Sequence, residues 1–392
     1  MLFRSGEFFA WFIGWNLILE YMMGATTVAV AWSGYFDKLL HLFGINIPIQ
    51  FSNDPFTAAE KMGIEGSVLA FNLPAFLIVW FVTSILFKGI KEAAKTNNII
   101  VVVKIAVVLF VIIVGAFYID VDNWTPFIPE RVFDADGQGH FGWDGVVTGA
   151  TIVFFAYIGF DAVSTQAGEA INPRKDIPFA VIFSLLICTV LYIAVSLVLT
   201  GMVKYDTLDI KAPVASAFAN VGLPWAVFII TVAAVAGLTS VMLVMMLAQT
   251  RIFLGMAKDG LLPRNMFASI HPKFKTPYKS TILVGAIVSV VASVTPIDKV
   301  SEMCSMGTLL AFAMISGAVW LLRYQAPDLD RPYRAPFIPF VATMGVGFNV
   351  WLMTKVRHDT WVAFLIWGSI GILVYFAYSR RHSNLNNPQI EE

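Results

Sequence analysis

Charged residues are scarce in this sequence. Only 13% of its 392 residues are Asp, Glu, Lys or Arg, whereas 58% are hydrophobic and the mean hydropathy is +0.75. A soluble domain carries more charge than this even when its core is large, so the composition indicates an integral membrane protein. The formal net charge is zero, so the sequence offers no attraction to nucleic acid or to another highly charged macromolecule.

Cysteine and histidine are also rare, and their positions exclude further classes of protein. Cys188 and Cys304 lie inside apolar stretches, where they are interpreted as small hydrophobic residues rather than as a disulfide framework. All five histidines fall in predicted loops, so no predicted membrane helix offers an imidazole to a haem or quinone site. The sequence contains neither an HExxH nor a GxSxG motif. We therefore expect no enzyme activity, no metal site and no bound cofactor.

Long apolar stretches account for most of the chain. Crossing roughly 30 Å of hydrocarbon takes about 20 helical residues, and ten stretches approach or exceed that length. The predicted spans are residues 8–35, 69–88, 98–119, 143–167, 179–203, 223–250, 280–296, 301–323, 337–355 and 359–379. The loops between them are short, and no separate soluble domain is visible, so we expect an all-α integral membrane protein with one transmembrane domain over residues 1–392.

The distribution of Lys and Arg predicts the orientation of these spans, because positive charge is retained on the cytoplasmic side of a membrane. Alternate loops hold 17 and 8 of the 26 basic residues, and one more, Lys104, lies inside a span. The more basic set includes both ends of the chain. We therefore expect a multi-pass protein with both termini in the cytoplasm.

Three ionisable residues lie well inside predicted spans: Glu20, Lys104 and Asp161. An ionisable group in hydrocarbon costs free energy and usually has a function there. One interpretation is a cluster at a common depth that binds substrate or exchanges a proton. The other is that Lys104 extends toward the inner headgroups while the two carboxylates are satisfied by helix contacts. The apolar surroundings of Lys104 (VVVKIAVVLF) favour the first interpretation for that residue.

The fourth span carries Gly159 among aromatic and β-branched residues (FFAYIGFD). Glycine lowers helix stability by about 1 kcal/mol relative to alanine, so the sequence predicts an unwound hinge here. Unwinding would free backbone carbonyls and amides at membrane depth, which is tolerated where they meet protein or a solute. The alternative is that Gly149 and Gly159 only permit close helix packing.

Four loop segments carry a family resemblance: GEAINPRKDIP, RIFLGMAKDGLLP, TPYKST and RPYRAPFIP. They are similar to landmarks of the amino acid, polyamine and organocation transporters. Within that superfamily, two stretches resemble the third to fifth helices of the bacterial cationic amino acid transporter branch: GWNLILEYMMGATTVAVAWSGYF and FKGIKEAAKTNNIIVVVKIAVV. The resemblance runs over nearly the whole chain in a consistent order.

This resemblance implies a fold and a site. The fold is the LeuT type, with five-plus-five inverted repeats and two further helices, and transport proceeds by alternating access across the plasma membrane. The fourth span matches the family's broken sixth helix, so backbone groups there would receive the substrate's amino group and Phe155 would close the outer gate. The implied substrate-binding residues are Phe155, Ala156, Ile158 and Gly159.

The resemblance also implies proton coupling. Lys104 matches a fifth-helix lysine that stands where sodium-coupled relatives bind their cation, and Ser240 matches the eighth-helix side of that site. Together with Glu20 and Asp161 they form the expected coupling residues, with the proton as coupling ion.

Ten spans are fewer than the family's twelve. The chain begins where the family's third helix begins, so the resemblance implies that the first two helices, and with them half of the binding site, are missing. An inactive remnant and a passive uniporter or channel therefore remain alternatives to a symporter. The partners we expect are an amino acid and the lipid bilayer. The sequence leaves open cationic or neutral substrates, symport or exchange, and the oligomeric state.

Overall fold

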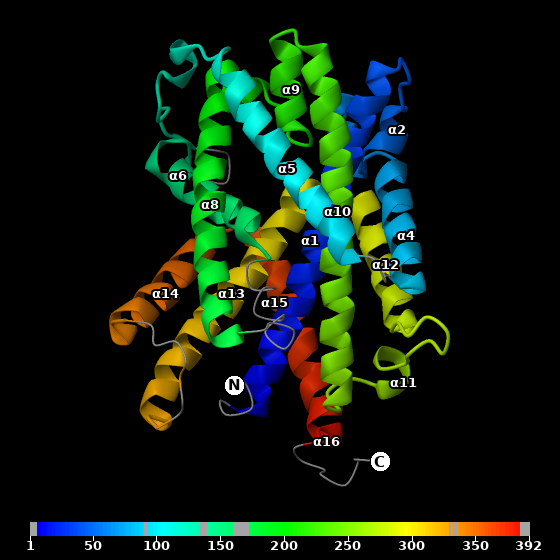
Figure 1. The fold of residues 1–392 in the computed structure, drawn as a ribbon, viewed down its shortest axis with the longest axis vertical. Coiled ribbons are helices and arrows are strands. Elements are labelled where there is room, and N and C mark those ends of the chain that lie inside the picture. The colour runs from blue at the N-terminus through cyan, green and yellow to red at the C-terminus, as the bar shows by residue number, and fades with distance from the viewer. Residues whose placement is uncertain are drawn as a thin grey trace.

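The computed structural model describes residues 6–89, 93–133, 139–159, 172–328, 331 and 336–384. Within these ranges the chain is a bundle of helices (Figure 1). The longer helices are α1 (Glu7–Leu42), α4 (Leu73–Lys88), α5 (Ala93–Ala116), α6 (Gly142–Val153), α8 (Pro173–Met202), α10 (Pro224–Lys258), α12 (Tyr278–Val294), α13 (Ile297–Gln325), α14 (Ile338–Met353) and α15 (His358–Val374). Among the described residues, four helical runs are both long and apolar enough to cross a membrane: α8, α10, α13 and residues His358–His382.

Short elements occupy the connections. They are α2 (Ile49–Ser52), α3 (Pro55–Lys61), η2 (Val121–Trp124), β1 (Val132–Phe133), β2 (Gly139–His140), η3 (Phe154–Tyr157), η5 (Tyr205–Thr207), α9 (Pro213–Asn220), α11 (Arg264–Phe267), η6 (Tyr375–Ser379) and α16 (Arg380–His382). The two strands pair antiparallel. The predicted loops 36–68 and 120–142, interpreted from sequence as irregular turns, thus contain short helices and this hairpin.

Local sequence explains several helix boundaries. The Asp54 side chain accepts hydrogen bonds from the amides of Phe56 and Thr57 at 3.1 and 3.0 Å and so begins α3, with proline at its first position. Asn72 begins α4 by accepting from the Ala75 amide at 3.2 Å. At the other end, α10 stops at Lys258, and Gly260 follows with φ +78°. The Asp-Gly pair therefore ends this helix, as the sequence predicts.

Two helix pairs have extensive mutual contacts. α1 lies along α10, and α4 lies along α12. The α1–α10 pair is antiparallel: Gly14 faces Met256, Gly24 faces Met245, and the Trp32 indole donates to the Val235 carbonyl at 3.1 Å. α1 also packs against α13, so it is buried along most of its length.

The outer helices present apolar side chains to the surroundings. On α8, Leu186, Val190 and Ile193 each have more than half of their surface exposed. Exposed apolar surface on this scale is typical of contact with lipid. α1 begins and α16 ends at the same, lower end of the bundle in Figure 1, whereas α9 and α2 lie at the opposite end. We call these the inner and outer ends.

Several observed helices extend beyond the predicted spans. α1 continues to Leu42, past the predicted end at residue 35, and α8 begins at Pro173, before the predicted start at residue 179. α10 continues eight residues beyond the end of its span at residue 250, up to the Asp-Gly pair that is expected to stop it. The predicted span 143–167 is not one continuous α-helix, since α-helical geometry ends at Val153.

Candidate functional site

The fourth predicted span contains a break in helical geometry. After α6 ends at Val153, a 3-10 turn covers Phe154–Tyr157, and Ile158 then adopts an extended backbone with φ −64° and ψ 135°. Gly159 follows with φ +110°, which is accessible at little cost only to glycine. The expected loss of α-helix near Gly159 is present and begins earlier than predicted, because the aromatic run before the glycine also has low helix propensity.

Backbone carbonyls at the break form hydrogen bonds inside the protein. The Phe155 carbonyl accepts from the Ile158 amide at 3.1 Å. The Ala156 carbonyl accepts from the Tyr192 hydroxyl of α8 at 2.7 Å. Since a carbonyl oxygen has two lone pairs, each of these groups retains one for a ligand. The four residues expected to bind substrate therefore lie in one short segment with carbonyl acceptors that α8 and the local turn hold in place.

Aromatic side chains surround this segment. Phe154 packs edge-on against Phe312 of α13, with ring centroids 5.7 Å apart. Tyr157 contacts the Tyr192 ring at 5.4 Å, and its hydroxyl lies 3.0 Å from the Thr189 hydroxyl. Phe155 packs against the main core formed by α1, α4, α10, α12 and α13. The side chains around the break are thus mainly apolar, and the hydroxyl groups of Tyr157 and Tyr192 are polar groups among them.

Lys104 lines a cavity of about 310 Å³ between α5 and α10. The lining is otherwise apolar apart from Tyr35 and consists mainly of valine, alanine and leucine side chains. The lysine stem lies against Gly237, where an added Cβ would stand 3.0 Å from Lys104 Cε. Ser240 is three residues further along α10, one helical turn from that contact, and does not line the cavity. Lys104 therefore contacts α10 about one helical turn before Ser240.

Glu20 lies elsewhere. Its side chain is fully buried on α1, and its backbone carbonyl accepts from the Cys304 thiol of α13 at 3.0 Å. The antiparallel register of α1 and α10 places it opposite Gln249, twelve residues from Gly237 and therefore about 18 Å away along α10. The expectation that Glu20 and Lys104 share a depth is wrong, because Lys104 meets α10 much nearer its outer end. Asp161 falls outside the described residues.

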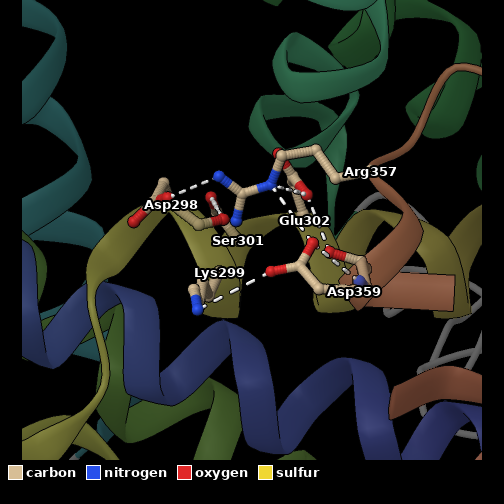
Figure 2. Close-up of polar contacts among 7 residues, drawn as sticks. Asp298, Lys299, Ser301, Glu302, Arg357 and Asp359 are labelled. Atoms are coloured by element: carbon tan, nitrogen blue, oxygen red, sulfur yellow. Dashed lines mark hydrogen bonds and ion pairs between the residues drawn. The ribbon is translucent and has the colours of Figure 1, made fainter. Parts of the chain in front are cut away.

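A network of ion pairs joins α13 to α15 at the outer end (Figure 2). Arg357 contacts Asp298 at 3.0 Å, Glu302 at 3.3 Å and Asp359 at 3.5 Å. Glu302 also accepts from the Thr360 hydroxyl at 2.8 Å. The Glu302 side chain is only 10% exposed, so Arg357 offsets the cost of burying its charge. Among the described residues, no group of three or more His, Cys, Asp or Glu is placed to hold a metal ion.

Comparison with known proteins decides the class. Residues 2–377 match a family described as amino acid permease. The chain belongs to this family. It is a multi-pass membrane transporter and not an enzyme.

Individual relatives extend this result. The chain is 44% identical to the methylthioribose transporter of Bacillus subtilis and 42% identical to the branched-chain amino acid permease BcaP of the same organism. Each match covers 97% of this chain and 78% of the relative. It is also 37% identical to the vacuolar cationic amino acid transporter 4 of Arabidopsis thaliana, over 82% of this chain and 51% of the relative.

Sequence reasoning missed several polar residues that the permease fold brings together. Tyr192 gives no local sign that it reaches Ala156, because the two are far apart in the chain. The ion-pair network had a weak signal, since Glu302 and Asp359 lie at the starts of predicted spans and Asp298 lies just before one. Lys211, buried in an outer loop, had none.

Proposed function

We propose that this protein carries amino acids with apolar side chains across the plasma membrane, coupled to protons, by alternating access. The break at Phe154–Gly159 is the observation that carries the proposal. Membrane helices lose regular hydrogen bonding only where protein or a bound solute satisfies the freed groups, and transporters bind charged substrate groups at such breaks. Here the break occurs in a chain of the amino acid permease family.

The arrangement of the central helices supports a LeuT-type inverted-repeat fold with ten spans in one domain. α1 and α4 succeed one another in the first half of the chain, and α10 and α12 do so in the second half. α1 pairs with α10 and α4 with α12. α1 and α10 run antiparallel, as corresponding helices of two inverted repeats would. The excess of Lys and Arg in loops at the inner end supports cytoplasmic termini.

Substrate recognition follows from the break. The ammonium group of the amino acid would bind the carbonyls of Phe155, Ala156 and Ile158, and Phe155 would cover it from the outer side. Phe154 and Phe312 provide apolar surface for a branched side chain. The likeness to BcaP, whose name gives branched-chain amino acids as its substrates, supports the same choice.

Lys104 and Ser240 would couple transport to protons. A charged ammonium in a cavity lined by valine and alanine is costly in free energy, so Lys104 is suited to release and regain a proton during the cycle. Its contact with Gly237 means that movement of α10 against α5 changes its surroundings. Glu20 and Asp161 would contribute charge at other points of the path, with no further cofactor.

Uptake of radiolabelled leucine into proteoliposomes tests this function. We expect saturable uptake that isoleucine and valine inhibit and arginine does not, because the described segment around Phe155 is apolar. Methylthioribose is tested as a competitor, because the two Bacillus subtilis relatives are named for different substrates, methylthioribose and branched-chain amino acids. Transport of methylthioribose without leucine would contradict the proposal, and arginine uptake equal to leucine uptake would contradict the apolar specificity.

A further inference from the structure

A second, larger cavity lies at the outer end of the bundle. Its volume is about 910 Å³, within the range typical of ligand sites. It is bounded by the end of α1, by α3, by the segment before α9 and by the start of α13. Its charged lining residues are Lys38, Glu60, Lys61, Asp209, Lys211, Asp298 and Lys299. It is separate from the break in α6 and from the Lys104 cavity.

The four lysines of this cavity differ in their partners. Lys38 pairs with Asp209 at 3.2 Å, and Lys299 pairs with Asp359 at 3.6 Å. Lys211 donates to the neutral side-chain amide of Asn53 at 2.7 Å. Within the described part of the chain, Lys61 and Lys211 have no carboxylate partner in an ion pair. Neither ammonium group is thus neutralised by a direct ion pair, although Asp209 attracts both of them from further away.

Lys211 is held in place despite its charge. Only 8% of its surface is exposed, and its amide donates to the Asp209 carboxylate at 2.9 Å. A Cβ on Gly34 would stand 2.5 Å from Lys211 Cβ, so glycine is required there for α1 to approach this residue. An ammonium has three donors, and the bond to Asn53 uses one. The site thus contains a fixed, buried cation with donors to spare.

The electrostatics at Lys211 favour an anionic ligand. Burial, and next the positive charge of Lys61, lower the pKa of Lys211 to about 8, whereas Asp54, Asp209 and Asp37 act in the opposite direction. The exposed carboxylate of Glu60 also lines the cavity. An anion between Lys61 and Lys211 would offset both the burial and the repulsion between the two ammonium groups.

We propose that this outer cavity binds the carboxylate group of an amino acid before the amino acid enters the transport path, with Lys61 and Lys211 as the groups that hold it. The inference rests on the proposed function only for the identity of the ligand. Phe56, Leu208 and Ile210 provide an apolar wall for its side chain. The ion pairs of Lys38 and Lys299 border the same space.

Binding to the purified protein, measured by calorimetry, tests the proposal with three probes: valine, isovalerate, which is valine without its amine, and isobutylamine, which is valine without its carboxylate. We expect valine and isovalerate to bind and isobutylamine not to bind. Lys61→Gln should weaken isovalerate binding about tenfold, since a charge-assisted hydrogen bond is lost. Lys204→Gln, an exposed lysine of the same outer segment that does not line the cavity, is the matched control.

The pH dependence gives a second readout. Lys211 is charged below its pKa of about 8, so isovalerate affinity should fall as pH rises through 8. Lys61→Gln removes a neighbouring positive charge and should therefore move this fall to higher pH. This shift reports the interaction between the two lysines, and the loss of affinity at low pH in Lys61→Gln reports contact with the ligand.

Each outcome separates this inference from the proposed function. Isovalerate binding that is equal in wild type and Lys61→Gln would overturn the inference even where leucine is transported. Lys61-dependent isovalerate binding without leucine transport would retain the carboxylate site while the proposed function fails. Chloride or phosphate that binds with the same Lys61 dependence and displaces isovalerate at equal concentration would overturn the assignment to carboxylates.

Discussion

Tyr192 connects the break after α6 to α8 through its hydroxyl group. The bond to the Ala156 carbonyl orients that carbonyl at the point where we place the substrate's ammonium. Tyr192→Phe keeps the ring and its contact with Tyr157 and removes the hydroxyl, which also interacts with the Cys188 thiol on the same helix. The lost bond to Ala156 contributes about 1 kcal/mol, a factor of about five in affinity. We predict a KM for leucine about five times higher at nearly unchanged thermal stability. Tyr324→Phe, in an exposed position on α13, is the control. Equal KM values in the two variants would contradict this role.

At the scale of single residues, the sequence indicated which side chains are unusual for their surroundings. It did not indicate which side chains contact one another. Lys104 and Gly159 stand out because a charge and a helix-breaking residue lie in apolar runs. The common depth of Lys104 and Glu20 was predicted wrongly. Hydropathy locates a residue along its own helix, but it does not give the register between that helix and its neighbours. The contacts of Ala156 with Tyr192 and of Lys211 with Asn53 join distant segments, so no local pattern could predict them.

At the scale of helices, α4 and α12 approach each other closely at Gly285. An added Cβ there would stand 2.7 Å from Thr83 Cγ2, and the Thr83 hydroxyl is fixed by a hydrogen bond to the Val79 carbonyl at 2.7 Å. We predict that Gly285→Ala forces the helices apart and lowers stability by about 1 to 3 kcal/mol, seen as a lower thermal unfolding midpoint in detergent.

Two controls accompany this prediction. Gly255→Ala, on α10 with no atom within 4 Å of the added Cβ, should leave the midpoint unchanged or raise it slightly. Adding Thr83→Ala to Gly285→Ala should restore part of the loss by making room. A midpoint for Gly285→Ala equal to that of Gly255→Ala would show that the close approach does not matter.

Element boundaries were predictable where caps act locally. The Asp-Gly pair after α10 ends that helix, and prolines precede or open α4, α8 and α14. The sequence predicted the interruption of the fourth span near Gly159, whereas α-helical geometry already ends at Val153. Hydropathy could not locate this end, because apolar aromatic residues are equally hydrophobic in a 3-10 turn and in an α-helix.

Over the whole molecule, composition predicted a multi-pass membrane protein, and family membership agrees with the resemblance seen in the loop motifs. The pairing of α1 with α10 and of α4 with α12 could not be derived from hydropathy, since these helices are apolar on all sides. In our account this central group holds still while the broken helix and its neighbours open alternately to the two sides. In the proposed mechanism, Lys104 lies between α5 and α10 and would respond to that movement.

Proton movement driven by substrate tests this account most directly. Proteoliposomes that enclose a pH-sensitive dye should acidify inside when leucine is added outside, and a protonophore should abolish leucine accumulation. Lys104→Ala should abolish the pH dependence of uptake, and Lys104→Met, which keeps the stem beside Gly237, should do the same. Leucine entry without acidification, and with the same pH dependence in Lys104→Ala as in the wild type, would contradict proton coupling and indicate a passive uniporter.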